Sequence, residues 1–180
     1  MQEVLGFGPI RTGLAYVPSC LVAAMSSGAA AQLVARVGTR PLVVGGSLTT
    51  ALGLLLLSRL SPDGTYAADL LPGLLVLSSG IGFVFVTVVA AGNAGVGEDR
   101  SGTAAALLNS GQQVGAALGL AVLLAISDAV TNNRMAAGAN AVEALTDGFG
   151  AALLMGAALL AAAALVGLRT VNTHDPEPLA

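Results

Sequence analysis

The sequence predicts an all-α integral membrane protein, a helical bundle with about five transmembrane helices, and three observations indicate this fold class. Five long apolar runs divide the chain, and as helices most of them reach across the roughly 30 Å of a hydrocarbon core. Charged residues make up only 9% of the 180 residues, whereas ordinary soluble domains contain about 25%. The mean hydropathy is +0.84, and a soluble domain of this length has too little interior to bury five such runs.

The clearest pair of runs lies on either side of a short polar hinge, Gly97 to Gly102, which holds three consecutive charges. Because these charges need water or lipid headgroups, the two runs are expected to form a transmembrane hairpin. Another pair of apolar runs is separated by a short segment in which Gly38 is expected to end one helix and Pro41 suits the first turn of the next. The apolar pattern and its breaks predict a membrane domain over residues 13–168, with helices at about 13–37, 41–57, 67–94, 103–126 and 147–168.

The connecting segments are polar or rich in turn-forming residues. Residues 1–12 are expected to be a loop before the first helix, and Pro62-Asp63-Gly64 has the residues that a reverse turn favours. Residues 127–146 form the longest polar interruption, which we expect to be a loop with room for a short surface helix. The tail, residues 169–180, is polar, contains two prolines and is expected to be disordered.

Small residues recur at positions that suit close packing between membrane helices. Gly111, Gly115 and Gly119 repeat every four residues, which predicts a continuous packing seam along the fourth helix. Gly80 and Gly82 lie at the middle of the third helix. They allow either a flexible helix that faces a cavity or close packing against a neighbour, and packing is the favoured interpretation. In the first helix, Pro18 removes a backbone donor and is expected to kink the chain.

Three amide side chains, Asn109, Gln112 and Gln113, share one face of the fourth helix, about a third of a turn from its glycines. Polar groups this far from a helix end are costly against lipid, so they are expected to face protein or water. Two interpretations stay open. The amides line a substrate path, or they make hydrogen bonds between helices, which is the more ordinary role.

Several kinds of chemistry are missing from the sequence. No carboxylate lies in the middle of an apolar run, and no phosphate-binding loop, zinc-binding or nucleophile-elbow motif is present. We therefore expect no catalytic residues, no metal, no cofactor and no enzyme activity. The net charge of −3 and the lack of any basic patch argue against nucleic-acid binding. Cys20 is the only cysteine, and a small, buried, apolar role is expected for it.

Four stretches of the chain share their pattern with one family of membrane proteins. They are Gln2 to Phe7 leading into Gly13 to Pro18, Arg36-Val37-Gly38-Thr39-Arg40, Gly102 to Ala105 with Asn109 to Ala121, and Gly148-Phe149. Together they resemble the C-terminal part of a major facilitator superfamily transporter, and most closely the fourteen-helix drug/proton antiporter subfamily. The third stretch is the most specific, since its string of small and amide residues is hard to match by composition alone. Arg36, Gly38 and Arg40 resemble a degraded copy of the superfamily's cytoplasmic loop motif.

The resemblance implies a partial major facilitator fold, equivalent to the last five of fourteen helices, in a multi-pass protein of the cell membrane. It implies efflux of small amphipathic substrates in exchange for protons. It also implies partners: the lipid bilayer and the N-terminal helices, which would hold the proton-coupling acids and one wall of the substrate path. Transport by these five helices alone is not expected, because such transporters need two pseudo-symmetric halves.

The resemblance also implies an orientation. The N-terminal loop is placed outside the cell, whereas the loops at 36–40 and 97–102 and the tail at 169–180 are placed in the cytoplasm. Arginine counts agree only weakly with this orientation under the positive-inside rule. A different class of function stays open beside transport, namely a non-transporting membrane subunit whose glycine faces bind partner helices.

Overall fold

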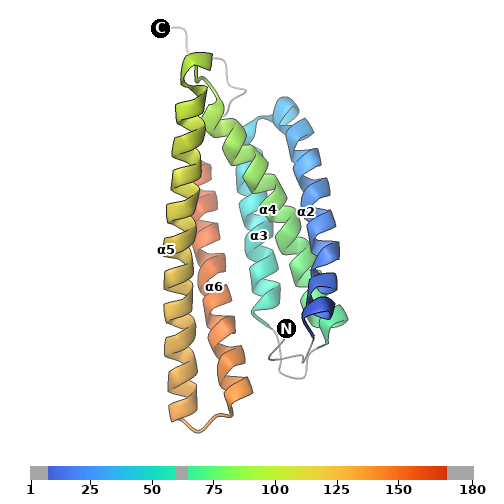
Figure 1. The fold of residues 1–180 in the computed structure, drawn as a ribbon, viewed down its shortest axis with the longest axis vertical. Coiled ribbons are helices and arrows are strands. Elements are labelled where there is room, and N and C mark those ends of the chain that lie inside the picture. Colours follow the sequence, from blue (N-terminus) through green and yellow to red (C-terminus); the bar gives the residue numbers. More distant parts are fainter. Residues whose placement is uncertain (1–7, 60–64, 170–180) are drawn as a thin grey trace.

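The structure is a computed structural model that describes residues 8–59 and 65–169, and all regular structure in these ranges is helical (Figure 1). Five helices are long and apolar enough to cross a membrane, counting the π-helical turn η1 (Tyr66–Leu70) as the start of α4. A 3₁₀ turn, η2 (Glu98–Arg100), leads into α5. The bounds are Pro9–Val37 for α2, Thr39–Leu57 for α3, Leu71–Asn93 for α4, Ser101–Ala136 for α5 and Ala141–Gly167 for α6. The predicted all-α membrane bundle is confirmed.

The helices form a connected series in which α4 packs between α2 and α3, and α6 packs between α3 and α5. The helix α3 is the most enclosed, with 39% of its most apolar window buried, against 11% for α2 and for α5. The helices α4 and α5 meet near their upper ends in Figure 1 and diverge below that point. As a result, α5 is attached to the other helices mainly through α6.

Glycines on both helices allow the backbones of α3 and α4 to approach each other closely. A Cβ atom on Gly53 of α3 would lie 2.5 Å from the backbone nitrogen of Leu77. From the other side, a Cβ atom on Gly80 would collide with Thr50 and lie 2.7 Å from the carbonyl oxygen of Gly46. In lipid, helix association depends on such close packing, because lipid tails are as apolar as the side chains and the hydrophobic effect does not drive helices together. These glycines therefore set the spacing between α3 and α4.

The turn between α2 and α3 consists of a single residue, Gly38, with φ of +80°. Its backbone N–H donates to the carbonyl oxygen of Val34 and so caps α2. The next residue, Thr39, already belongs to α3, and Pro41 lies in the first turn of that helix as expected. Only glycine adopts this positive φ without strain, so the tight connection depends on it.

Two predicted loops are shorter than expected. Helix α2 begins at Pro9, so residues 9–12 are helical rather than part of a loop. Proline suits the first helical position, where its missing N–H has no intrahelical partner in any case. Similarly, η2 and α5 take up most of the polar hinge that was predicted at 97–102. Residues 1–7, the predicted turn at 62–64 and residues 170–180 of the tail lie outside the described residues.

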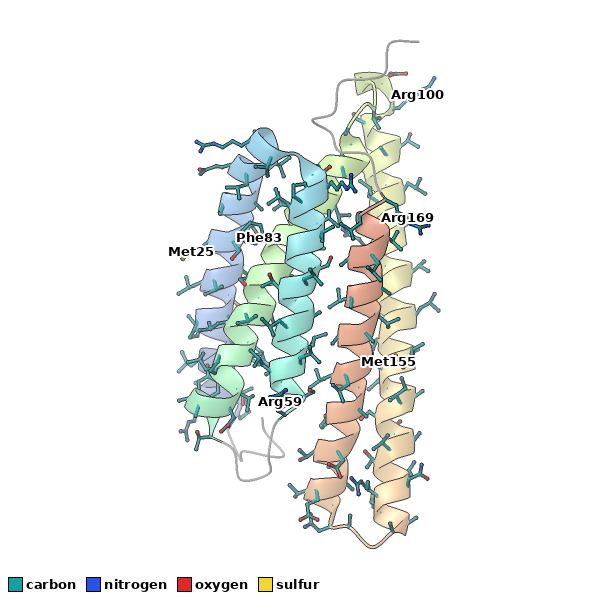
Figure 2. All side chains as sticks on the ribbon, turned by 180° about the vertical axis from the view of Figure 1, so that it is seen from behind. Met25, Arg59, Phe83, Arg100, Met155 and Arg169 are labelled. Atoms are coloured by element: carbon teal, nitrogen blue, oxygen red, sulfur yellow. The ribbon has the colours of Figure 1, made fainter. Side chains whose placement is uncertain are left out.

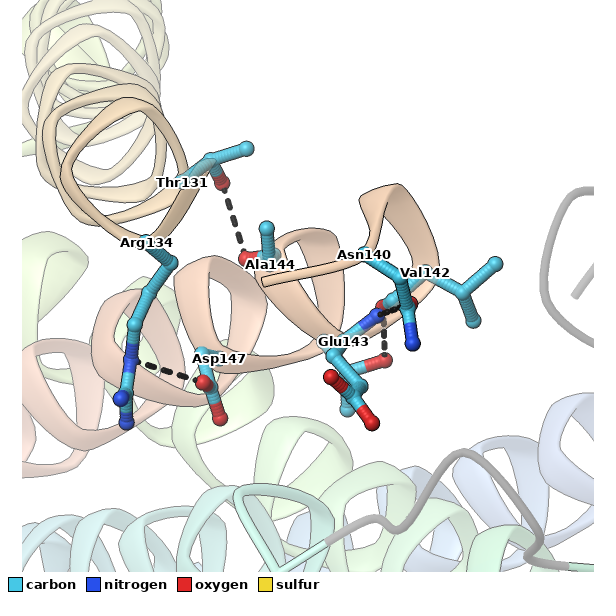
Figure 3. A network of polar contacts seen from close by, with 8 residues as sticks. Thr131, Arg134, Asn140, Val142, Glu143, Ala144 and Asp147 are labelled. Carbon is cyan, nitrogen blue, oxygen red and sulfur yellow. Dashed lines mark hydrogen bonds and ion pairs between the residues drawn. The ribbon is translucent and has the colours of Figure 1, made fainter. Parts of the chain in front are cut away.

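The loop predicted at 127–146 is wrong, because α5 continues to Ala136 and α6 begins at Ala141. Figure 3 shows the contacts that extend both helices. The hydroxyl of Thr131 donates to the carbonyl oxygen of Ala144 (3.2 Å), and Arg134 pairs with Asp147 (2.9 Å). The Asn140 side chain caps α6 by accepting from the backbone N–H of Glu143 (2.9 Å). The polar segment is thus a helical hairpin joined by a short turn.

The α3–α4 contact generates a prediction with a matched control. Gly53→Ala should lower the thermal unfolding midpoint in detergent, because the new methyl group meets the α4 backbone and overpacking costs about 1–3 kcal/mol. Gly45→Ala is the same change on the same helix, and its Cβ atom would meet nothing within 4 Å. It should leave the midpoint unchanged or raise it, since alanine favours a helix by about 0.5–1 kcal/mol over glycine. Equal midpoints for the two variants would contradict this packing.

Candidate functional site

The amide side chains of Asn109, Gln112 and Gln113 lie on α5 in the region where it has separated from α4. All three are exposed. The neighbouring residue Leu108 does contact α4, because its side chain packs against Gly92. The structure therefore places the three amides together on one helix, and it brings no other described helix against them.

The position of these amides along α5 makes their exposure costly. They lie about 12–18 Å along α5 from its first residue, in a helix that is long and apolar enough to cross the membrane. An amide without a hydrogen-bond partner at this depth carries a desolvation penalty of about 2–7 kcal/mol. The apolar side chains around them, Val114 and Leu118, are also about 60% exposed, at 59% and 64%. On this face of α5, polar amides and apolar side chains are thus exposed together, and no described helix covers them.

The glycine stripe predicted on α5 has no partner among the described residues. Gly111 and Gly115 are exposed and Gly119 is half-buried, and a Cβ atom on any of the three would meet nothing within 4 Å. The seam that the sequence predicts therefore lies open in this structure. Gly148 of α6 is different, because its Cβ atom would collide with Thr131 and come within 2.6 Å of the Ser127 carbonyl oxygen.

Gly80 and Gly82 are both buried, and they face different neighbours of α4. Gly80 faces Thr50 and Gly46 of α3. A Cβ atom on Gly82 would come within 2.7 Å of the Ala23 carbonyl oxygen and 2.9 Å of the Ser26 side chain on α2. The structure thus places both glycines in close helix contacts rather than on an open face.

The residues of the predicted cytoplasmic loop motif lie around the turn between α2 and α3. Arg36 is in the last turn of α2, where a cation interacts favourably with the helix dipole. Gly38 forms the turn, and Arg40 follows in the first turn of α3. Arg36 and Arg40 are both exposed. The motif therefore presents two guanidinium groups at one end of the bundle.

The described residues contain no group of three or more metal-ligating side chains. Cys20 is exposed on α2 and is not the buried apolar residue that was expected. The sequence analysis did not predict the contact of Gly148 with Ser127 and Thr131. It also did not predict the start of α6, although Asn140 followed three residues later by Glu143 is a recognisable helix-start pattern.

The chain matches the family model of the Major Facilitator Superfamily over residues 1–120. It is 38% identical to the puromycin resistance protein pur8 of Streptomyces alboniger over 82% of its own length. It is 35% identical to the cephamycin export protein CmcT of Amycolatopsis lactamdurans over 73%. It is 29% identical to the multidrug resistance protein Stp of Mycobacterium tuberculosis over 68%.

These alignments cover most of the present chain but only 22–30% of the length of those relatives. The family match covers two thirds of the chain and agrees with the five apolar helices of the structure. It also agrees with the expectation of a transport rather than an enzymatic role. The chain belongs to the Major Facilitator Superfamily, as a multi-pass protein of the cell membrane.

Proposed function

We propose that this chain contributes five helices to a proton-coupled efflux transporter for small amphipathic compounds, and that it does not transport alone. The observation that carries the proposal is the uncovered face of α5, where three amides and a glycine stripe lie exposed at membrane depth. A helix with this face needs a further protein layer, because lipid satisfies neither the amides nor the open seam.

The lengths of the relatives support the same proposal. The relatives are named for puromycin resistance, cephamycin export and multidrug resistance, and the chain spans less than a third of each. Superfamily transporters move substrate between two pseudo-symmetric halves that rock about a site near the bilayer midplane. Five helices supply at most part of one half. We propose that the remaining helices belong to a fourteen-helix antiporter, provide the proton-coupling acids and close the substrate path over α5.

Within this arrangement we assign different roles to the two exposed faces of α5. Gly111, Gly115 and Gly119 form the seam against a helix of the other part of the transporter. Asn109, Gln112 and Gln113 face the interior, where they donate to and accept from substrate or water. Amides suit a broad range of amphipathic substrates because each one is both a donor and an acceptor and carries no charge.

The proposed orientation places the turn between α2 and α3 and the start of α5 in the cytoplasm. Figure 1 draws both at the upper end of the bundle, with the turn between α5 and α6 at the opposite end. Figure 2 shows Arg100 and Arg169 at the upper end and Arg59 at the lower end. With Arg36 and Arg40, the upper end carries four of the seven arginines, and Arg11, Arg59 and Arg134 lie toward the lower end. This is a small excess in the direction that the positive-inside rule gives for a cytoplasmic face.

The open seam generates the first test of this function. Gly115→Leu should leave the thermal unfolding midpoint of the 180-residue chain unchanged, because no described atom lies within 4 Å of the new Cβ atom. In a complete transporter reconstructed around the chain, the same change should sharply reduce membrane abundance, since bulk forces the two helices apart. Gly148→Leu is the control and should lower stability in both settings. Unchanged abundance of Gly115→Leu in the complete transporter would remove the seam assignment.

The substrate path generates a second test in the complete transporter. Gln113→Leu keeps a similar side-chain volume and removes the amide, so membrane abundance should stay the same. Efflux of at least one dye should change by about 2–10-fold, the effect of one lost hydrogen bond. Transport is measured in vesicles and abundance separately. If abundance falls as far as with Gly115→Leu, the amide is a structural group. If the efflux of every dye is unaffected, Gln113 has no role in the path.

Chemical labelling tests the orientation. Single cysteines at Asn132 and Asp99, in a background with Cys20→Ser, both occupy exposed positions and should react equally in permeabilised cells. In intact cells, a membrane-impermeant thiol reagent should label the cysteine at Asn132 and spare the one at Asp99. The opposite pattern would reverse the orientation.

A further inference from the structure

The start of α2 and the start of α4 meet at one end of the bundle, and three backbone or side-chain irregularities coincide there (Figure 1). Pro18 lies inside α2, and α4 is preceded by the π-helical turn Tyr66–Leu70. The hydroxyl of Ser19 is buried and has no hydrogen-bond partner among the described residues. Its exposed fraction is 4%. No such buried, unpartnered side-chain oxygen or nitrogen is found elsewhere in residues 8–59 and 65–169.

Ser19 departs from the behaviour of the other hydroxyl groups in these helices. A serine or threonine in a helix commonly donates to the carbonyl oxygen three or four residues earlier. In this structure Ser58 and Ser79 donate three residues back, at 2.9 and 2.8 Å. Five threonines donate four residues back, at 2.6–3.1 Å: Thr12, Thr49, Thr50, Thr87 and Thr146. The Ser19 hydroxyl makes neither bond, and its acceptor four residues back is the carbonyl oxygen of Ala15.

The carbonyl oxygen of Ala15 accepts a hydrogen bond from the hydroxyl of Tyr66, 51 positions further along the chain. A carbonyl oxygen has two lone pairs, and the α-helical ladder uses one of them. The Tyr66 hydroxyl takes the second. The acceptor four residues before Ser19 is therefore filled as long as Tyr66 is docked against α2.

The two elements that meet here are both weakened as regular helices. Pro18 has no N–H, so the helical hydrogen bond to the residue four positions earlier, Leu14, is absent. On the other side, a π-helical turn is a less stable arrangement than an α-helical one and is often found where helices change shape. Both segments therefore bend more readily at this point than the α-helices that continue from them.

We propose that the Ala15 carbonyl oxygen is an exchangeable acceptor that serves two states of this end of the bundle. In the docked state it accepts from Tyr66, and Ser19 is left unpaired. When η1 moves away from α2, Tyr66 leaves and the Ser19 hydroxyl turns to the same oxygen. The acceptor is paired in both states, so separation of the two helix ends exposes no unsatisfied carbonyl and releases the buried hydroxyl.

Exchange of donors is a local, two-state change of the kind that biases a conformational equilibrium. Ser19 favours the separated state, because it gains a partner only there. Tyr66 favours the docked state. If the chain acts in transport as proposed above, this pair sets how readily the α2–α4 end opens. The exchange itself does not depend on that function and is measurable in the chain alone.

A double-mutant cycle on the 180-residue chain in detergent tests the exchange. Ser19→Ala should raise the thermal unfolding midpoint by about 2–4 °C, because it removes a buried hydroxyl without a partner. In the Tyr66→Phe background the acceptor is available, so Ser19→Ala should instead lower the midpoint. Ser79→Ala is the control. Its hydroxyl already bonds the Val76 carbonyl oxygen (2.8 Å), so its effect should be equal in both backgrounds. The same rise for Ser19→Ala in both backgrounds would overturn the proposal.

A distance measurement provides a readout that does not depend on the folding of the Tyr66 variant. Spin labels at Ile10 and Ala67, both exposed, report the separation of the two helix ends in a Cys20→Ala background. Ser19→Ala alone should shift the distribution to the shorter, docked distance. Tyr66→Phe should shift it to longer distances, and adding Ser19→Ala should reverse part of that shift. Identical distributions in the parent chain and in Ser19→Ala would overturn the proposal.

Discussion

The contact between the backbones of α3 and α4 is the constraint on which the rest of the bundle depends. Helices in lipid gain little from burying apolar surface against each other, so association requires the many short contacts that glycine permits. Gly53 and Gly80 supply these contacts from the two sides of one interface. Because α2 packs on α4 and α6 packs on α3, the positions of both outer helices follow from this central pair.

The two ends of the series differ in how completely their contacts are satisfied. On the α2 side, Gly82 packs against Ala23 and Ser26, and the Tyr66 hydroxyl donates to the Ala15 carbonyl oxygen. On the α5 side, the glycines and amides remain uncovered, although Gly80 and Gly82 of α4 are buried against neighbouring helices. The open glycines and amides of α5 support the proposal that further helices cover this face. It agrees with relatives that are several times longer than the aligned chain.

Hydropathy alone was sufficient to predict the five helices and the all-α class, because a membrane-spanning run leaves a strong signal in composition. It was not sufficient for residues 127–146, where polar side chains stabilise helices that project past the apolar run. Asn140 and Glu143 held local information about the helix start, but the pairing of Arg134 with Asp147 depends on how two helices meet. Periodicity likewise cannot say which glycine faces a neighbour. Gly80 and Gly115 look alike in sequence, and only the fold separates them.

The attachment of α5 mainly through α6 has a consequence for the order in which the protein is made. The helix α5 leaves the ribosome before α6, yet it has a much smaller contact with α4 than with α6. During synthesis α5 therefore has few contacts with α2, α3 and α4 until α6 follows it. The capped start of α6 and the tight turn that precedes it allow the two helices to close as a hairpin as soon as α6 emerges. The main contact of α5 thus forms between two helices that are adjacent in sequence, and it does not require pairing with a helix distant in the chain.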